Sequence, residues 1–185
     1  MKPAPGSEFA TAMAMTDATW KRHANPWSVW TRVPVLLVLC TAVWSRDWIG
    51  AWAWIPVSIT SIWIWWNPRA FAEPAATDNW ASEATFGERV WLNRNAIPIP
   101  VEHARMARLL LTISALGLPF LVWGLWKLEL WPTVFGLTLI YAGKMWFLDR
   151  MVWLYRKMKD AHPEYQSWHV ASEVGRTEPG VCGAK

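Results

Sequence analysis

The sequence predicts an all-α integral membrane protein with about four transmembrane helices, arranged as two helical hairpins plus an amphipathic helix in the membrane interface. Three observations predict this. The chain is 54% hydrophobic, which is above the range of an ordinary soluble domain. It has 18 tryptophans, whose apolar ring and polar N–H suit a membrane–water interface. Its apolar residues also gather in four blocks of roughly the length that a bilayer core requires.

The first hairpin is predicted to contain spans at residues 26–45 and 48–66. Asn25 is a favourable helix cap and Pro26 is favoured as a first helical residue, so the first span should begin there. The second span is a run of 19 uncharged residues, long enough to cross a bilayer core. We expect it to stop at Asn67, because the residue before a proline is disfavoured in a helix.

The second hairpin is predicted at residues 106–126 and 130–149, joined by a charged tight turn. The polar connection between the hairpins, residues 67–102, is too long for a plain loop and should contain structure of its own. We expect a helix at residues 79–93, capped by Asp78, whose apolar face lies in the membrane interface.

The chain divides into three parts. Residues 1–14 lack the apolar region of a signal peptide and read like a vector-derived leader, so they are excluded from the prediction of the fold. Residues 15–160 should form a single membrane domain. Residues 161–185 are expected to be a flexible cytoplasmic tail.

Lysine and arginine are unevenly distributed among the connecting segments. The N-terminal segment, the middle connection with the start of the third span, and the C-terminal segment together hold fifteen, whereas the two short turns hold one each. Such an excess marks the cytoplasmic side of a membrane protein. Both termini should therefore be cytoplasmic, with the two turns on the opposite side.

Polar side chains should converge on the cytoplasmic face, which makes this face the candidate site. An arginine and a helix start both favour anions, so the cluster could hold a lipid headgroup or position a small substrate. The alternative for each residue is structural, as a helix cap, an ion pair or a charge that extends to water. The candidates are His23, Asn25, Arg32, Asn67, Arg69, Glu88, Arg89, Lys144, Asp149 and Arg150.

Lys144 is the most informative of these residues, because it interrupts an apolar span about five residues before its charged end. Ionisable groups inside a membrane are costly and often functional, although Lys144 is close enough to the interface to extend toward water. On a helix it shares a face with Tyr141, and Asp149 points away. Its partner is therefore predicted on another helix. Glu88 could pair with it or with a nearby arginine.

Nothing in the sequence identifies a cofactor. His23, His103 and His162 lie in separate segments without metal-ligand spacing, so we expect no metal site. The net charge of +4 is better explained by cytoplasmic charge bias than by nucleic acid binding. Membrane lipids are the expected partners, and a second copy or another membrane protein could also bind.

Three stretches of the chain resemble a family of small prokaryotic membrane proteins of unknown function. They are residues 23–32 (HANPWSVWTR), residues 78–91, which contain DNWAS and GERVW, and residues 144–153 (KMWFLDRMVW). The resemblance covers roughly residues 18–160 and implies a prokaryotic inner-membrane location. It supplies no activity and no site residues. The tryptophan content is also similar to that of tryptophan-rich sensory proteins that bind tetrapyrroles, but those have five spans where we predict four.

Three functions remain open at this point. The first is binding of a lipid headgroup or small apolar ligand, or service as an accessory subunit, because apolar helices meet a basic face without a recognisable catalytic motif. The second is an interfacial enzyme that acts on a lipid or hydrophobic substrate, given the convergence of ionisable residues. The third, a transporter or channel, has less support because the hairpins show no inverted repeat.

Overall fold

The structure is a computed structural model that describes residues 15–171. The segment interpreted as a leader, residues 1–14, and the end of the predicted tail, residues 172–185, lie outside the described residues. Within the described part of the chain, every regular element is a helix. The predicted all-α fold class is therefore confirmed.

The first hairpin begins with three short helices whose limits are set locally. The Asn25 side chain accepts from the Trp27 N–H (2.9 Å), which caps the second helix as predicted. Pro34 has no backbone N–H, and the span predicted to run unbroken through residues 26–45 is interrupted there. The helices are α2 (Asp17–His23), α3 (Pro26–Arg32) and α4 (Val35–Trp44).

The turn and second helix of this hairpin differ from the prediction. The chain reverses with Gly50 at φ +57°, so the long helix begins at Trp54 rather than residue 48. The predicted stop at Asn67 is wrong, because the helix continues to Ala70. Asn67 is fully buried, and its side chain accepts a hydrogen bond from Ser28 of α3. This contact outweighs the local preference against a helical residue before proline. The elements are α5 (Arg46–Ile49), η1 (Gly50–Ala53) and α6 (Trp54–Ala70).

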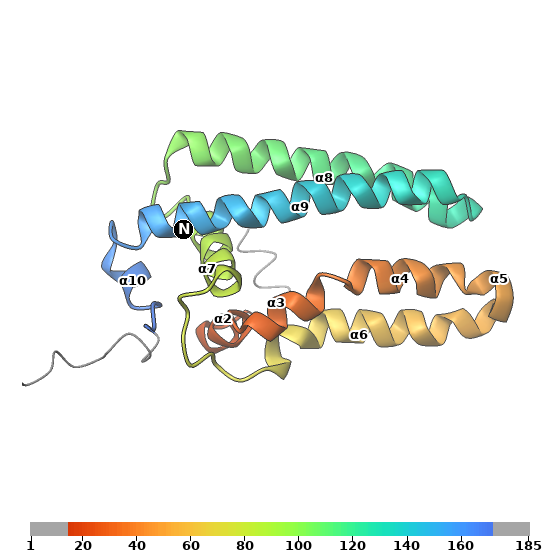
Figure 1. The fold of residues 1–185 in the computed structure, drawn as a ribbon, viewed down its shortest axis with the longest axis horizontal. Coiled ribbons are helices and arrows are strands. Elements are labelled where there is room, and N and C mark those ends of the chain that lie inside the picture. The colour runs from red at the N-terminus through yellow and green to blue at the C-terminus, as the bar shows by residue number, and fades with distance from the viewer. Residues whose placement is uncertain (1–14, 172–185) are drawn as a thin grey trace, which may run out of the picture.

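The middle connection contains the predicted helix, α7 (Trp80–Leu92). Its cap is Asn79 rather than Asp78, because Asn79 Oδ1 accepts from the Ser82 N–H (3.0 Å). The helix does not have the exposed apolar face that was predicted, because most of its residues are buried by the protein. Ser82 and Ala84, on opposite sides of α7, are both fully buried by the surrounding protein. The helix crosses the ends of both hairpins, so its role is to join them (Figure 1).

The second hairpin consists of α8 (Val101–Lys127) and α9 (Leu130–Met158), which pack closely along their length. The helices approach through glycines. A Cβ at Gly117 would lie 2.6 Å from the carbonyl oxygen of Gly136, too close for a side chain. Small residues at such a contact are typical of membrane helices. α8 begins five residues before the predicted span, whereas α9 continues into the charged extension as expected.

The prediction of a flexible tail from residue 161 is wrong for the part of it that the structure describes. This part contains α10 (Pro163–Gln166), followed by residues that pack on α7. Trp168 is buried, with its ring centroid 5.8 Å from that of Phe86. The Thr77 N–H donates to the Val170 carbonyl (2.9 Å). The buried aromatic side chains hold this segment against α7, although its overall polarity predicted a flexible tail.

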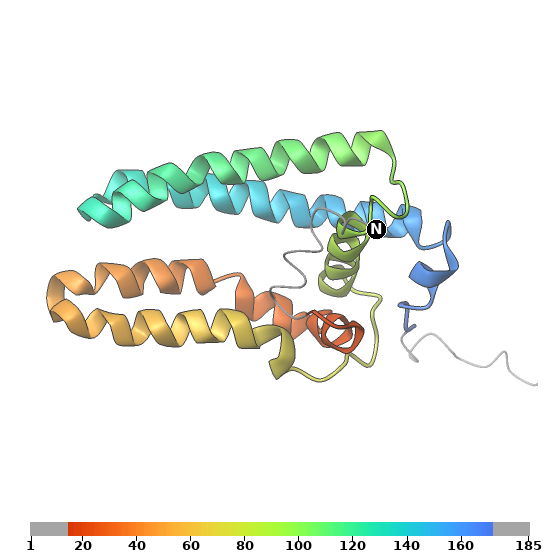
Figure 2. The same ribbon diagram turned by 180° about the vertical axis from the view of Figure 1, so that it is seen from behind.

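The two hairpins lie side by side, with both turns at one end of the molecule and α2, α7 and α10 at the other (Figures 1 and 2). At the turn end, the Arg46 guanidinium donates to the carbonyls of Leu125 and Trp126. Nearer the middle, the Tyr141 hydroxyl donates to the Val33 carbonyl (2.6 Å). The hairpins are therefore connected at both ends and at one point between.

Within residues 15–171, two helical segments are long and apolar enough to cross a membrane: the run Pro26–Ala70, which contains α3 to α6, and the helix Val101–Lys127. The segment Pro26–Ala70 reverses direction at α5 and η1, so it forms both sides of the first hairpin (Figure 1). α9 is longer than α8, but charged residues such as Lys144 and Asp149 lower its hydropathy.

Candidate functional site

A cavity of about 520 Å³ lies between the hairpins at the end where α7 joins them. Side chains from α2, α3, α4, α6, α7, α8 and α9 line it. Most of the lining is apolar, including Leu36, Ile64 and Ile140. Its volume falls in the range of small-molecule sites, which are mostly apolar with a few placed polar groups.

Four ionisable side chains that were predicted as site candidates line this cavity. His23 and Arg32 are the last residues of α2 and α3, whereas Glu88 lies on α7 and Lys144 on α9. Helices that end at the cavity thus deliver two of the side chains, and helices that cross beside it deliver the other two. The fold brings together residues that are up to 121 positions apart in sequence.

His23 is 7% exposed and has one hydrogen-bonding partner, Arg32. The distance from Arg32 Nη1 to His23 Nε2 is 2.5 Å. A guanidinium can only donate, so Nε2 accepts and the proton of the neutral ring lies on Nδ1. Nδ1 is buried and has no hydrogen-bond partner. Burial, followed by the charges of Arg32, Lys144 and Arg69, lowers the pKa of His23 well below its usual value of 6.5.

The Arg32 guanidinium is partly buried, and its charge is not matched by a bonded carboxylate. Its Nε donates to the Ser28 carbonyl (2.9 Å) and its Nη1 donates to His23. Among the described residues, no carboxylate lies within ion-pair distance of it. A cation in an apolar cavity is costly without a counter-charge, so this end of the cavity favours an anion.

Lys144 pairs with Glu88, with 2.5 Å between Nζ and Oε1. The prediction that Lys144 has its partner on another helix is confirmed. The Lys144 ammonium also lies 4.9 Å from the centroid of the Phe147 ring. The pair joins α7 to α9 at the cavity wall and satisfies both charges.

Three further candidates have structural roles beside the cavity. Asn25 caps α3, and its Nδ2 donates to the Ala72 carbonyl (3.0 Å). Asn67 accepts from Ser28 Oγ (2.9 Å) and donates to the Thr31 hydroxyl, which fixes α6 against α3. The Arg69 guanidinium lies 4.5 Å from the Trp65 ring centroid near the end of α6.

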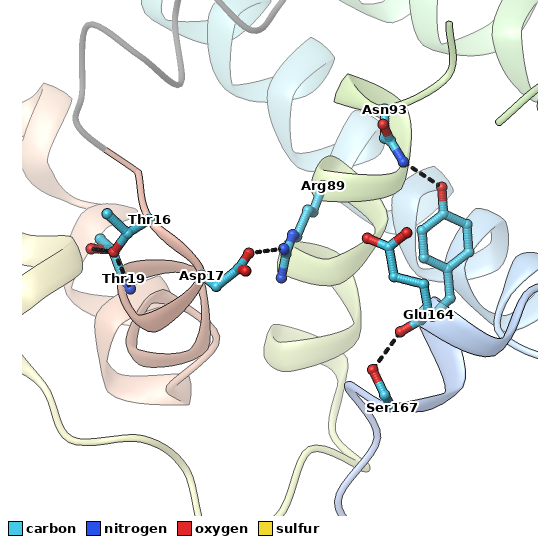
Figure 3. A network of polar contacts seen from close by, with 8 residues as sticks. Thr16, Asp17, Thr19, Arg89, Asn93, Glu164 and Ser167 are labelled. Carbon is cyan, nitrogen blue, oxygen red and sulfur yellow. Dashed lines mark hydrogen bonds and ion pairs between the residues drawn. The ribbon is translucent and has the colours of Figure 1, made fainter. Parts of the chain in front are cut away.

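The remaining candidates lie away from the cavity. Arg89 pairs with Asp17 of α2, as Figure 3 shows, and its guanidinium lies 4.1 Å from the centroid of the Trp168 ring. Asp149 and Arg150 pair with one another at 2.8 Å. The Arg89–Asp17 pair joins α7 to α2, the Asp149–Arg150 pair lies within α9, and none of these residues lines the cavity.

The chain belongs to a family of unknown function, DUF6653. The sequence model of that family matches residues 6–173. The resemblance to an uncharacterised family, given above on three sequence stretches, is therefore confirmed. No curated protein matches the chain. No solved structure matches it either.

Tyr141 belongs to the site although it was not among the candidates. It lines the cavity one turn before Lys144, and its hydroxyl donates across to the other hairpin at Val33. Its place on the same helical face as Lys144 was the available signal. Among the described residues, no group of three or more His, Cys, Asp or Glu could hold a metal ion.

Proposed function

We propose that this protein is a four-span membrane protein that binds a lipid-like amphiphile in the cavity between its hairpins. The polar head would lie beside His23 and Arg32, and the apolar part would lie against Leu36, Ile64 and Ile140. The proposal is supported by the exposed apolar surface of the hairpins, the placement of their tryptophans, the distribution of positive charge and the composition of the cavity.

The surfaces of the hairpins support four crossings. The most apolar stretches of the two candidate segments are only 28% and 22% buried within the protein, whereas the core helix of a soluble protein would be mostly covered. At 1.5 Å per residue, α8 and α9 are about 40 Å long, and α6 is about 25 Å. The run from Pro26 to Trp44, which contains α3, α4 and the two residues between them, is about 28 Å long. These lengths are near or above the ~30 Å of a bilayer core.

Exposed tryptophans lie toward both ends of the hairpins, where interfaces would be. At the turn end are Trp48, Trp52, Trp54, Trp126 and Trp131, each more than 70% exposed. Toward the other end are Trp27, Trp30, Trp65, Trp66, Trp146 and Trp153, each at least half exposed. Between them the exposed large apolar side chains are mostly aliphatic, with aromatic exceptions such as Phe120 and Phe135. This order matches the aromatic belts of membrane proteins.

The distribution of positive charge supports a cytoplasmic position for α2, α7 and α10. Lysine and arginine are concentrated in the segments at that end, with one in each short turn at the other. We propose a prokaryotic inner membrane as the location, with the cavity near the cytoplasmic leaflet. Membrane lipids, or amphiphiles dissolved among them, are then the molecules that can reach the cavity.

The observation that carries the proposal is the chemical asymmetry of the cavity. At one side are the Arg32 guanidinium, which has no bonded carboxylate among the described residues, and the buried ring of His23. The rest of the lining is mostly aliphatic and aromatic, apart from Thr85 and the Glu88–Lys144 pair, whose charges offset one another. A wholly apolar ligand would leave the polar groups without hydrogen-bonding partners. A wholly polar ligand would leave the apolar walls in contact with water. An amphiphile meets both requirements.

Native mass spectrometry of gently purified protein tests this function. We expect a stoichiometric bound amphiphile on the wild-type protein. Leu36→Trp, which places an indole into the cavity, should remove it. The matched control is Leu37→Trp, since the neighbouring Leu37 is 49% exposed and does not line the cavity. If both variants lose the bound amphiphile, or if both retain it, the proposal is overturned.

A further inference from the structure

The formal charges that line the cavity do not balance. Among the described lining residues there are two cations, Arg32 and Lys144, and one carboxylate, Glu88. Glu88 and Lys144 pair directly and cancel one another. The charge of Arg32 remains, so the cavity has one positive charge in excess.

His23 lines this cavity but adds no charge to it. Its Nε2 accepts from the Arg32 guanidinium, so Nε2 carries no proton and the ring is neutral. The proton on Nδ1 has no protein acceptor. A ligand that enters here therefore meets one guanidinium that has no carboxylate within ion-pair distance among the described residues.

We infer that the head of the amphiphile is a monoanion, held by Arg32 with His23 beside it, and that Glu88 limits the head to a single negative charge. The inference rests on the proposed function. The matching chemical classes are a carboxylate, as in a fatty acid, and a phosphodiester, as in an anionic phospholipid. A phosphomonoester carries about −1.5 to −2 at pH 7, and its second charge would find no free cation in the cavity, because Glu88 already pairs with Lys144.

The first experiment measures the head preference of the wild-type protein. Full-length protein, delipidated in a neutral maltoside detergent at pH 7.5, is titrated with oleate, phosphatidylglycerol, phosphatidylethanolamine or phosphatidic acid. Bound ligand is counted by native mass spectrometry. We expect oleate, phosphatidylglycerol or both to bind about tenfold or more tightly than the zwitterion and the phosphomonoester. Oleate alone would identify a carboxylate head, and phosphatidylglycerol alone a phosphodiester head.

Charge variants test the role of Glu88. Glu88→Gln leaves two lining cations, so the preference should move to phosphatidic acid. The double variant with Lys144→Gln restores a single excess positive charge and should restore the monoanion preference. Arg32→Gln should weaken monoanion binding about ten- to a hundredfold, the range for a hydrogen bond to a charged group. Arg108→Gln removes an exposed cation outside the cavity and should change nothing.

The outcomes separate the two proposals. Tight binding of phosphatidic acid by the wild type, or equal binding of all four lipids, would overturn the monoanion inference and leave the amphiphile site standing. An unchanged preference in Glu88→Gln would also overturn it. Should that variant not fold, Lys144→Gln alone leaves no excess charge, and it must then lose the preference for anions. Binding of none of the lipids would overturn the proposed function itself.

Discussion

Gly87 of α7 lies directly against the backbone carbonyl of Met151 of α9. A Cβ at position 87 would overlap the Met151 carbonyl group and contact its side chain. The two helices cross at this point, and the crossing places Glu88, the next residue, against Lys144. The cavity wall therefore depends on the absence of a side chain at one position.

Gly87→Ala should destabilise the protein by about 1–3 kcal/mol or more, the cost of overpacking a close contact. The direction of this change in stability is informative, because alanine is otherwise more favourable than glycine in a helix by about 1 kcal/mol. Thermal unfolding in detergent measures the change. An equal or higher midpoint for Gly87→Ala would show that α7 and α9 are not in contact here.

Asn67→Leu should lower stability by about 1–3 kcal/mol, because it leaves the buried Ser28 hydroxyl without its acceptor. The double variant with Ser28→Ala removes both partners and should be less unstable than the sum of the single changes. Unfolding of the four proteins in a double-mutant cycle measures the coupling. Additive effects would mean that Asn67 does not fix α6 to α3.

Acidification should destabilise the fold through His23. Its pKa is lowered in the folded state, by burial first and then by Arg32, Lys144 and Arg69. Below pH 6.5 the unfolded chain therefore binds a proton that the folded chain does not, and stability falls by up to about 1.4 kcal/mol per pH unit. Unfolding midpoints between pH 7.5 and 5.5 check this. His23→Gln should flatten the profile, and an unchanged slope in that variant would exclude His23 as the cause.

Trp168→Ala should cost about 3 kcal/mol or more, as expected for a buried tryptophan. Its ring packs against Phe86 of α7 and under the guanidinium of Arg89. His169→Ala, at an exposed neighbouring position, is the matched control and should have little effect. Limited proteolysis and thermal unfolding would follow both. Equal behaviour of the two variants would contradict a packed C-terminal segment.

The helices of the fold could be predicted because their signals are local. The Asn25-Pro26 cap, the charge-free run that supplies residues 54–66 of α6, and the apolar block of α8 need no distant partner to be recognised. The partner of Lys144 could be placed on another helix, because the face opposite Asp149 follows from helical geometry alone.

What could not be predicted depends on tertiary contacts. Asn67 remains helical because its amide is buried against α3, and no neighbouring residue signals that. α7 is amphipathic in sequence, but the residues that cover its second face come from elsewhere in the chain. The polar C-terminal stretch concealed Tyr165 and Trp168 as core residues. The cavity itself exists only where two hairpins and a crossing helix meet.

Photolabelling within a membrane tests the central claim most directly. The protein would be placed in vesicles that contain phosphatidylglycerol with a photoreactive diazirine in its acyl chain, then irradiated and digested to map the labelled residues. We predict strong labelling at cavity residues such as Leu36 and Ile64, competed by excess unlabelled lipid, above the uncompeted labelling of exposed Leu116. Labelling confined to outward residues such as Leu116, with none in the cavity, would contradict the account.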